Sequence, residues 1–126
     1  MTQEEKDLLL KDICARLPYG VKVYALFDKE KPLIREMGLG TLHDFMLDNI
    51  EVKPYLCPMS SMTEGEKKEV NRLFTVLYDK NNVVCGIQIN SFAQLDKVIE
   101  WLNKRHFDYR GLIEKGLALE AKEGMY

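Results

Sequence analysis

The strongest constraint on the fold is a cap-and-stripe pattern that occurs three times along the chain. Each occurrence starts with Ser or Thr and has Glu or Gln three residues later, which resembles the capping box of a helix start. Apolar residues then follow at the i, i+3, i+4, i+7 spacing that places them on one face of a helix. The caps are Thr2 with Glu5, Thr63 with Glu66 and Ser91 with Gln94. The pattern predicts helices over about residues 3–16, 64–78 and 92–105.

Three apolar stripes cannot all face water, so these helices must pack on one another and on a sheet. The stripes are Leu10, Ile13, Cys14 and Leu17, then Val70, Leu73, Phe74 and Leu77, and finally Leu95, Val98, Ile99 and Leu102. The chain has 46% hydrophobic and 30% charged residues, a balance typical of a folded globular domain. We therefore expect a packed core that contains all three helices.

The β-branched and aromatic segments predict strands. We expect strands over 21–27, 33–37, 50–52 and 83–89, with turns at 28–32, 48–49 and 81–82 and a tight turn or bulge at 38–40. Residues 41–47 fit either a strand or one helical turn. Near the C-terminus, Asp108 is placed to cap one or two turns over 109–115, Gly116 to close them, and 117–121 to be extended. We expect the last five residues to be loose.

These elements predict an α+β fold: a small antiparallel β lobe followed by three amphipathic helices packed on it, with one further short strand. We expect residues 1–126 to form a single domain with a β-rich lobe over about 21–58 and a helical lobe over about 63–121. The proline-bordered connector between these lobes is the expected boundary.

Charge and cysteine usage favour a cytoplasmic protein. The formal net charge of −2 does not favour a nucleic-acid binder or a membrane surface as partner. The acidic start and the short apolar run at 8–10 do not resemble an export signal. Cys14, Cys57 and Cys85 include no Cys-x-x-Cys pair, so we expect free thiols. We expect Cys14 and Cys85 on buried faces. Cys57 lies in the connector, either exposed or covered, and is the candidate reactive thiol if it is exposed.

Histidine lies beside carboxylate at two places, which is the chemistry of a possible metal site. The residues are His106 with Asp108 and His43 with Asp44. Neither histidine stands at i, i+4 spacing from another ligand, so the favoured interpretation is structural: His106 ends a helix and Asp108 begins the next turn. Gly38-Leu39-Gly40 lacks the remaining residues of a nucleotide-binding loop, and we expect no cofactor.

Two groups of residues are candidates for binding a partner. One is the aromatic and basic C-terminal group, Trp101, Arg105, Tyr109 and Arg110, together with Lys104 and Phe107. Its composition fits base stacking with phosphate contacts, although a core role for the aromatics is favoured. The other is the connector with Tyr55, Met59 and Met62, which either covers the core or forms a docking strip.

Two segments carry a resemblance to a known family. Residues 52–64, VKPYLCPMSSMTE, and 106–121, HFDYRGLIEKGLALEA, are similar to motifs of a family of small uncharacterised proteins from gut anaerobic bacteria. The family usually has a basic residue where this chain has Cys57. The resemblance implies a bacterial cytoplasmic protein, often associated with phages or other mobile elements, and implies no activity.

The sequence favours a non-catalytic protein-binding or adaptor module over an enzyme. Its expected partner is an unidentified protein, with no membrane partner and no metal. Two alternatives remain open: a metal-assisted hydrolase using His106 and Asp108, with His43 and Asp44, and a nucleic-acid accessory protein of a mobile element.

Overall fold

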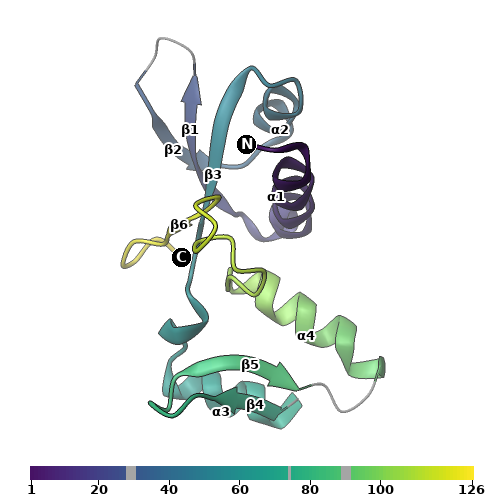
Figure 1. Ribbon diagram of the computed structural model, residues 1–126, viewed down its shortest axis with the longest axis vertical. Coiled ribbons are helices and arrows are strands. Elements are labelled where there is room, and N and C mark those ends of the chain that lie inside the picture. Colours follow the sequence, from purple (N-terminus) through teal and green to yellow (C-terminus); the bar gives the residue numbers. More distant parts are fainter. Residues whose placement is uncertain (28–30, 74, 89–91) are drawn as a thin grey trace. The chain divides into compact units, whose positions relative to one another are not determined.

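The computed structural model describes residues 1–27, 31–73, 75–88 and 92–126 and has an α+β fold (Figure 1). It consists of two compact units. Unit 1 contains Met1–Leu56 and Gly111–Tyr126, and unit 2 contains Cys57–Arg110. The C-terminal segment thus returns to the unit that holds the N-terminus, whereas the sequence pattern assigned most of it to the helical lobe.

Unit 1 contains a four-stranded sheet in the order β2-β1-β3-β6. The strands are β1 (Lys22–Phe27), β2 (Leu33–Glu36), β3 (Ile50–Leu56) and β6 (Leu119–Glu120). β1 pairs antiparallel with both β2 and β3, and β3 pairs parallel with β6. The predicted antiparallel sheet is confirmed. The strand expected over 50–52 is longer and continues through Pro54 to Leu56. The predicted charged turn at 28–32 falls partly outside the described residues.

Two helices, α1 (Gln3–Arg16) and α2 (Leu39–Met46), lie on the same side of this sheet (Figure 1). Val23, Ala25 and Val52 alternate along β1 and β3 with polar or half-buried residues and are fully buried. They share one apolar core with Leu9 of α1 and Phe45 of α2. The two-residue period of the strands therefore places one face of the sheet under the helices.

Helix α1 has the predicted bounds and capping box, but its buried face differs from the predicted stripe. Cys14 is exposed, and the buried positions are Leu9, Asp12, Ile13 and Arg16. Arg16 donates from Nε to Asp12 Oδ2 at 2.9 Å and from Nη2 to Asp12 Oδ1 at 3.1 Å. Both side chains of this pair have 0% exposed area. The prediction of the buried face was wrong because it used only the spacing of apolar residues. Asp12 and Arg16 are charged, but they form an ion pair and can therefore occupy buried positions.

Helix α2 replaces the tight turn that the glycines at 38 and 40 predicted. Gly38 has an extended backbone and is the residue before the helix, and the first intrahelical bond runs from Leu42 N to Gly38 O at 3.0 Å. The glycine pair therefore starts a helix rather than a turn. The predicted turn at 48–49 is present, with Asp48 at φ 61°.

The C-terminal segment is held against the sheet of unit 1. Residues 109–110 and 112–116 form turns, as predicted for 109–115, and Gly116 closes them with φ 74°. The extended piece expected over 117–121 is present as β6 over Leu119–Glu120, after a bend at 117–118. The prediction of a loose end was wrong, because the Tyr126 hydroxyl donates to Tyr55 O at 2.7 Å and accepts from Lys22 N at 2.8 Å.

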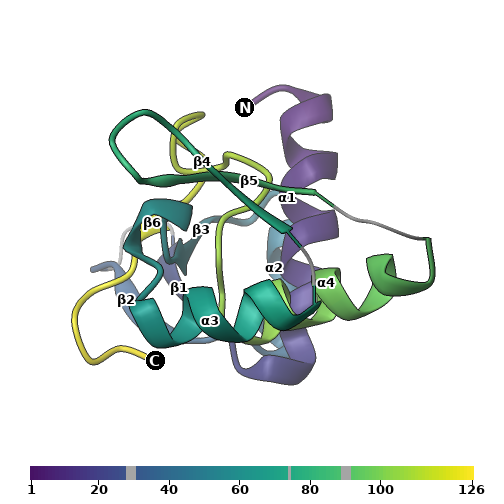
Figure 2. The same ribbon diagram turned by 90° about the horizontal axis from the view of Figure 1, so that it is seen from below.

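Unit 2 contains helices α3 (Glu64–Leu73) and α4 (Phe92–Lys104) and a hairpin of β4 (Thr75–Tyr78) and β5 (Val84–Gln88). The two strands run side by side in both views (Figures 1 and 2). The Thr63 and Glu66 capping box is confirmed, with Glu66 N donating to Thr63 Oγ1 at 3.2 Å. The Ser91 cap lies outside the described residues. The core includes Met62, Val70, Val98, Leu102 and Phe107.

The helix predicted over 64–78 was wrong beyond residue 73, because 75–78 is strand β4. The hairpin turn explains the change. Asp79 Oδ1 accepts from the backbone N–H groups of Asn81 and Val83 at 2.8 and 3.0 Å, and Asn82 has φ 61°. This closed turn brings β5 beside β4, and the β-branched and aromatic residues of 75–78 favour a paired strand over a further helical turn.

Asp12→Ala should strongly destabilise unit 1, because it leaves the buried Arg16 guanidinium without its carboxylate. We expect a loss of about 3 kcal/mol or more in the free energy of unfolding. Urea denaturation followed by circular dichroism measures it. As the control, the double variant Asp12→Leu with Arg16→Met removes both charges and should lose much less; an equal loss in the two proteins would contradict the role of the ion pair.

Candidate functional site

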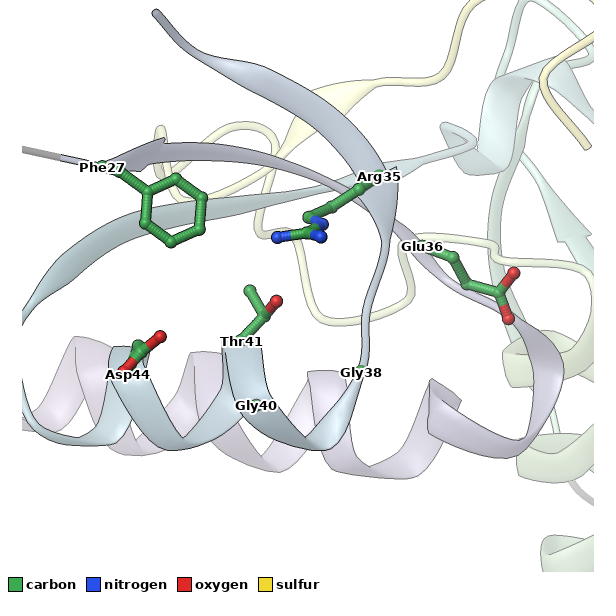
Figure 3. A pocket seen from close by; sticks show the side chains of 7 residues that line it. All are labelled: Phe27, Arg35, Glu36, Gly38, Gly40, Thr41 and Asp44. Atoms are coloured by element: carbon green, nitrogen blue, oxygen red, sulfur yellow. The ribbon is translucent and has the colours of Figure 1, made fainter. Parts of the chain in front are cut away.

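A pocket of about 390 Å³ lies in unit 1 between the edge of the sheet and the start of α2 (Figure 3). The sheet contributes Phe27 of β1 and Arg35 and Glu36 of β2. The helix side contributes Gly38, Gly40, Thr41 and Asp44. All of these residues belong to one unit, so the pocket is a local feature of the β2–α2 connection.

The short link between β2 and α2 builds this pocket. Met37 N donates to Val21 O at 2.8 Å, which extends the pairing of β1 and β2 by one residue beyond β2. Gly38 then leads directly into the helix, so the first turn of α2 must lie close to the end of β2. A Cβ at Gly38 or Gly40 would meet no atom within 4 Å, which shows that the space beside the link is open.

The first turn of α2 presents unbonded polar groups. The backbone N–H groups of residues 39–41 precede the first intrahelical bond, and Gly38 has no side chain to cap them. Thr41 is 8% exposed and lines the pocket. Among the described residues, no hydrogen bond involves the Thr41 hydroxyl. Figure 3 shows the Thr41 side chain pointing toward the Arg35 guanidinium.

Arg35 supplies a positive charge on the sheet side. Its guanidinium carbon lies 6.0 Å from the centre of the Phe27 ring, a cation–π distance. Within the part of the chain that the structure describes, Arg35 forms no ion pair. An arginine that forms no ion pair with the described carboxylates, beside an uncapped helix start, is an arrangement that attracts anions.

The pocket also contains two carboxylates, which limit what it can hold. Glu36 turns away from the Arg35 guanidinium, and Asp44 stands one helical turn beyond Thr41 (Figure 3). Asp44 is half-buried, whereas Arg35 is exposed. The pocket therefore has a donor side at Arg35 and Thr41 and an acceptor side at Asp44.

Among these residues, the sequence predicted a possible functional role only for Asp44, as a metal ligand. The signal that could have found the pocket is a strand followed at once by Gly-x-Gly-Thr and apolar residues at helical spacing. Because the glycines at 38 and 40 also fit a turn or bulge, the start of helix α2 was not predicted at this position.

The aromatic and basic group predicted near the C-terminus is present in unit 2, but its ring faces are occupied. Trp101 and Phe107 are buried and stack with centroids 5.7 Å apart. Arg105 covers Trp101 at 5.0 Å and donates to Glu69 Oε2 at 2.8 Å. Arg110 covers Tyr109 at 4.7 Å. These contacts place the aromatics in the core and in intramolecular cation–π pairs.

The predicted docking strip is divided between the two units. Tyr55 is buried in β3 of unit 1. Met62 is buried in the core of unit 2, and Met59 is half-buried against that core. Tyr55 and Met62 therefore contribute little exposed apolar surface.

The histidine–carboxylate pairs lie in different units, His43 with Asp44 in unit 1 and His106 with Asp108 in unit 2. Within the described residues, no group of three or more His, Cys, Asp or Glu side chains could hold a metal ion. His106 is buried and ends α4 in a Schellman arrangement: its N–H donates to Asn103 O at 3.1 Å, and Phe107 N donates to Leu102 O at 3.0 Å. It takes the left-handed position with φ 60°.

The cysteines are free thiols, but the exposure of Cys14 and Cys85 differs from the prediction. Cys14 and Cys85 are exposed, and Cys57 is half-buried. The prediction for Cys14 was wrong because the buried face of α1 is turned by one residue toward Leu9 and Ile13. Cys57 is held between backbone partners: its N–H donates to His106 O at 2.7 Å, and its carbonyl accepts from Asp108 N at 2.9 Å.

Comparison with protein-family models, curated proteins and solved structures found no match for this chain. The family resemblance of residues 52–64 and 106–121 therefore stays a prediction. Among the described residues, no helix combines the length and apolar character needed to cross a bilayer.

The exposure of the thiols predicts their order of reaction. In the native protein, N-ethylmaleimide should modify Cys14 and Cys85 before Cys57, because a thiol reacts in proportion to its access to reagent. Peptide mass spectrometry at successive times measures the order. The same reaction in urea is the control, since unfolding should remove most of the difference. Native labelling of Cys57 first would contradict the structure of the connector.

Proposed function

We propose that this protein is a non-catalytic binding module that accepts an extended segment of a partner protein along the free edge of β2. The observation that carries the proposal is the position of β2 at one end of the sheet, with β1 on its only described paired side. A strand edge offers both N–H and C=O groups, and another extended backbone is the ligand that satisfies both.

The hydrogen-bond register identifies the groups that a partner would use. Val21 and Met37 form a hydrogen-bonded pair, and Val23 pairs with Arg35 two residues further along the same ladder. Bonded and non-bonded pairs alternate in an antiparallel ladder, so the Arg35 backbone faces β1. The backbone groups of Ile34 and Glu36 therefore face outward.

The side chains of β2 favour an apolar partner segment. Leu33 and Ile34 are 45% and 49% exposed, and they lie on opposite faces of the strand because successive residues alternate. Pro32 lies in the outward register of Ile34 and has no N–H, so it blunts the edge only at the beginning of the strand. A segment of about three to five residues would span the remaining edge.

The alternatives from the sequence receive less support. For the metal-assisted hydrolase, the described residues contain no group of three or more His, Cys, Asp or Glu side chains that could hold a metal ion. A nucleic-acid accessory protein needs open aromatic faces, whereas Trp101 and Tyr109 are covered by arginines of the same chain. We keep the cytoplasm of a bacterium as the proposed location and a mobile element as the proposed context.

Ile34→Pro tests the proposal, because it removes one outward N–H group while leaving the inward bonds of β2 to β1 in place. Peptides selected from a displayed random library should bind the wild-type chain and slow amide hydrogen exchange at Ile34 and Glu36. Their affinity for Ile34→Pro should fall about tenfold, the effect of one lost hydrogen bond with its partner left unsatisfied.

Ile34→Ala is the matched control, since it truncates the same side chain but keeps the N–H group. It should retain more affinity than Ile34→Pro. If Ile34→Pro unfolds in thermal melts, a peptide N-methylated at the facing residue tests the same bond from the other side. Selected peptides that leave exchange at Ile34 and Glu36 unchanged would overturn the proposal, as would a stable dimer of the chain that pairs through β2 and excludes them.

A further inference from the structure

We propose that the pocket beside Arg35 binds a small oxyanion group, phosphate or carboxylate, of a ligand that also offers a hydrogen-bond donor to Asp44. The inference does not rest on the strand-addition function. It concerns side chains and helix N–H groups on the face of the sheet that α2 covers, whereas strand addition uses the outward backbone of β2.

The donors for the oxyanion come from two elements. The N–H groups of residues 39–41 lie before the first intrahelical bond of α2, and no side chain caps them. The N-terminal end of a helix carries a partial positive charge of about half a unit, which favours an anion there. Glycine at 38 and 40 leaves the backbone open to close approach, because no side chain covers it.

Thr41 gives independent support for a ligand. Its side chain is more than nine-tenths buried, lines the pocket and points into it (Figure 3). Among the described residues its hydroxyl makes no hydrogen bond. The hydroxyl oxygen is not one of the enclosed polar atoms that lack a partner, so it keeps access to the pocket. A hydroxyl in that position can donate a hydrogen bond to an oxyanion in the pocket.

Arg35 completes the anion side. Its guanidinium reaches over the first turn of α2 and faces Thr41 across the open space (Figure 3). The guanidinium carbon lies 6.0 Å from the centre of the Phe27 ring, and no hydrogen bond or ion pair among the described residues uses its N–H groups. An arginine fork recognises the paired oxygens of phosphate or carboxylate.

Asp44 determines what else the ligand must carry. It lines the same pocket from the next turn of α2, and a carboxylate there repels a plain anion. A ligand with an ammonium or hydroxyl group near its oxyanion satisfies Asp44 instead. The pocket should therefore prefer zwitterionic ligands to simple anions of the same class.

Four small probes test the proposal and separate its two oxyanion sources. The full ¹⁵N-labelled chain is titrated with methyl phosphate, phosphoethanolamine, acetate and glycine, at ionic strength held constant with sodium chloride. We expect saturable shifts of the Gly40 and Thr41 amide signals with at least one pair of probes. Within that pair, the zwitterion should bind about fivefold more tightly, the effect of one exposed charge pair.

Matched variants assign the contacts. Arg35→Gln should weaken binding about tenfold through loss of a charge-assisted hydrogen bond. Thr41→Val keeps the side-chain shape and should weaken it less. Asp44→Asn should abolish the preference for the zwitterion. Lys11→Gln removes an exposed positive charge of α1 outside the pocket and should change nothing.

Three outcomes would overturn the inference or part of it. Absence of saturable shifts at Gly40 and Thr41 with all four probes would overturn it entirely. Equal weakening by Arg35→Gln and Lys11→Gln would show a general charge effect and not a site. A zwitterion that binds no better than its simple anion would overturn the role of Asp44. Ile34→Pro should keep these shifts, so failure of strand addition and failure of this site are distinguishable.

Discussion

The pairing of β1 on both of its edges is the interaction on which unit 1 depends. β1 is the only strand of the sheet in antiparallel register with two neighbours, β2 and β3. Its alternation buries Val23 and Ala25 under the helices. Arg35 is in register with Val23 and shares its face of the sheet, but it stands on the edge strand, where the core ends. The same alternation of side chains that buries Val23 therefore places the Arg35 side chain at the edge of the core.

The two-residue link of Met37 and Gly38 then determines which groups lie near that charge. Because Met37 is still bonded to β1 through Val21, α2 has to start directly beside the end of β2. A longer connection could have capped the helix with Ser, Thr or Asp, as happens at α1 and α3. Here the uncapped N–H groups, Thr41 and Arg35 border one space instead. The pocket therefore results from the short connection between β2 and α2.

The sequence predicted well those elements whose signals are local. The capping box and bounds of α1, strand β1, the antiparallel sheet and α4 follow from caps, β-branched residues and spacing within one segment. The sequence-based prediction failed where an element depends on a partner distant in the sequence, or on a buried polar pair. The 64–78 helix was overestimated because β4 forms by pairing with β5, and the α1 stripe was misplaced because Asp12 and Arg16 satisfy each other in the core. The pocket was missed for a related reason: Arg35 and Thr41 meet only when β2 and α2 are both in place.

The strand edge and the pocket share β2 but use different chemical groups, which makes them separable by design. The Arg35 backbone is bonded inward to β1, so its side chain can be changed without altering the outward edge. The outward backbone groups of Ile34 and Glu36 can likewise be changed without touching the guanidinium. A partner segment that carries a hydrogen-bond donor and an oxyanion at one end would bind both the strand edge and the pocket. Its overall affinity would exceed that of either contact alone, because the second contact becomes intramolecular. Along the four residues of β2, outward backbone groups alternate with residues bonded to β1. This alternation places a strand edge for an extended backbone and the Arg35 side chain for an oxyanion on the same short strand.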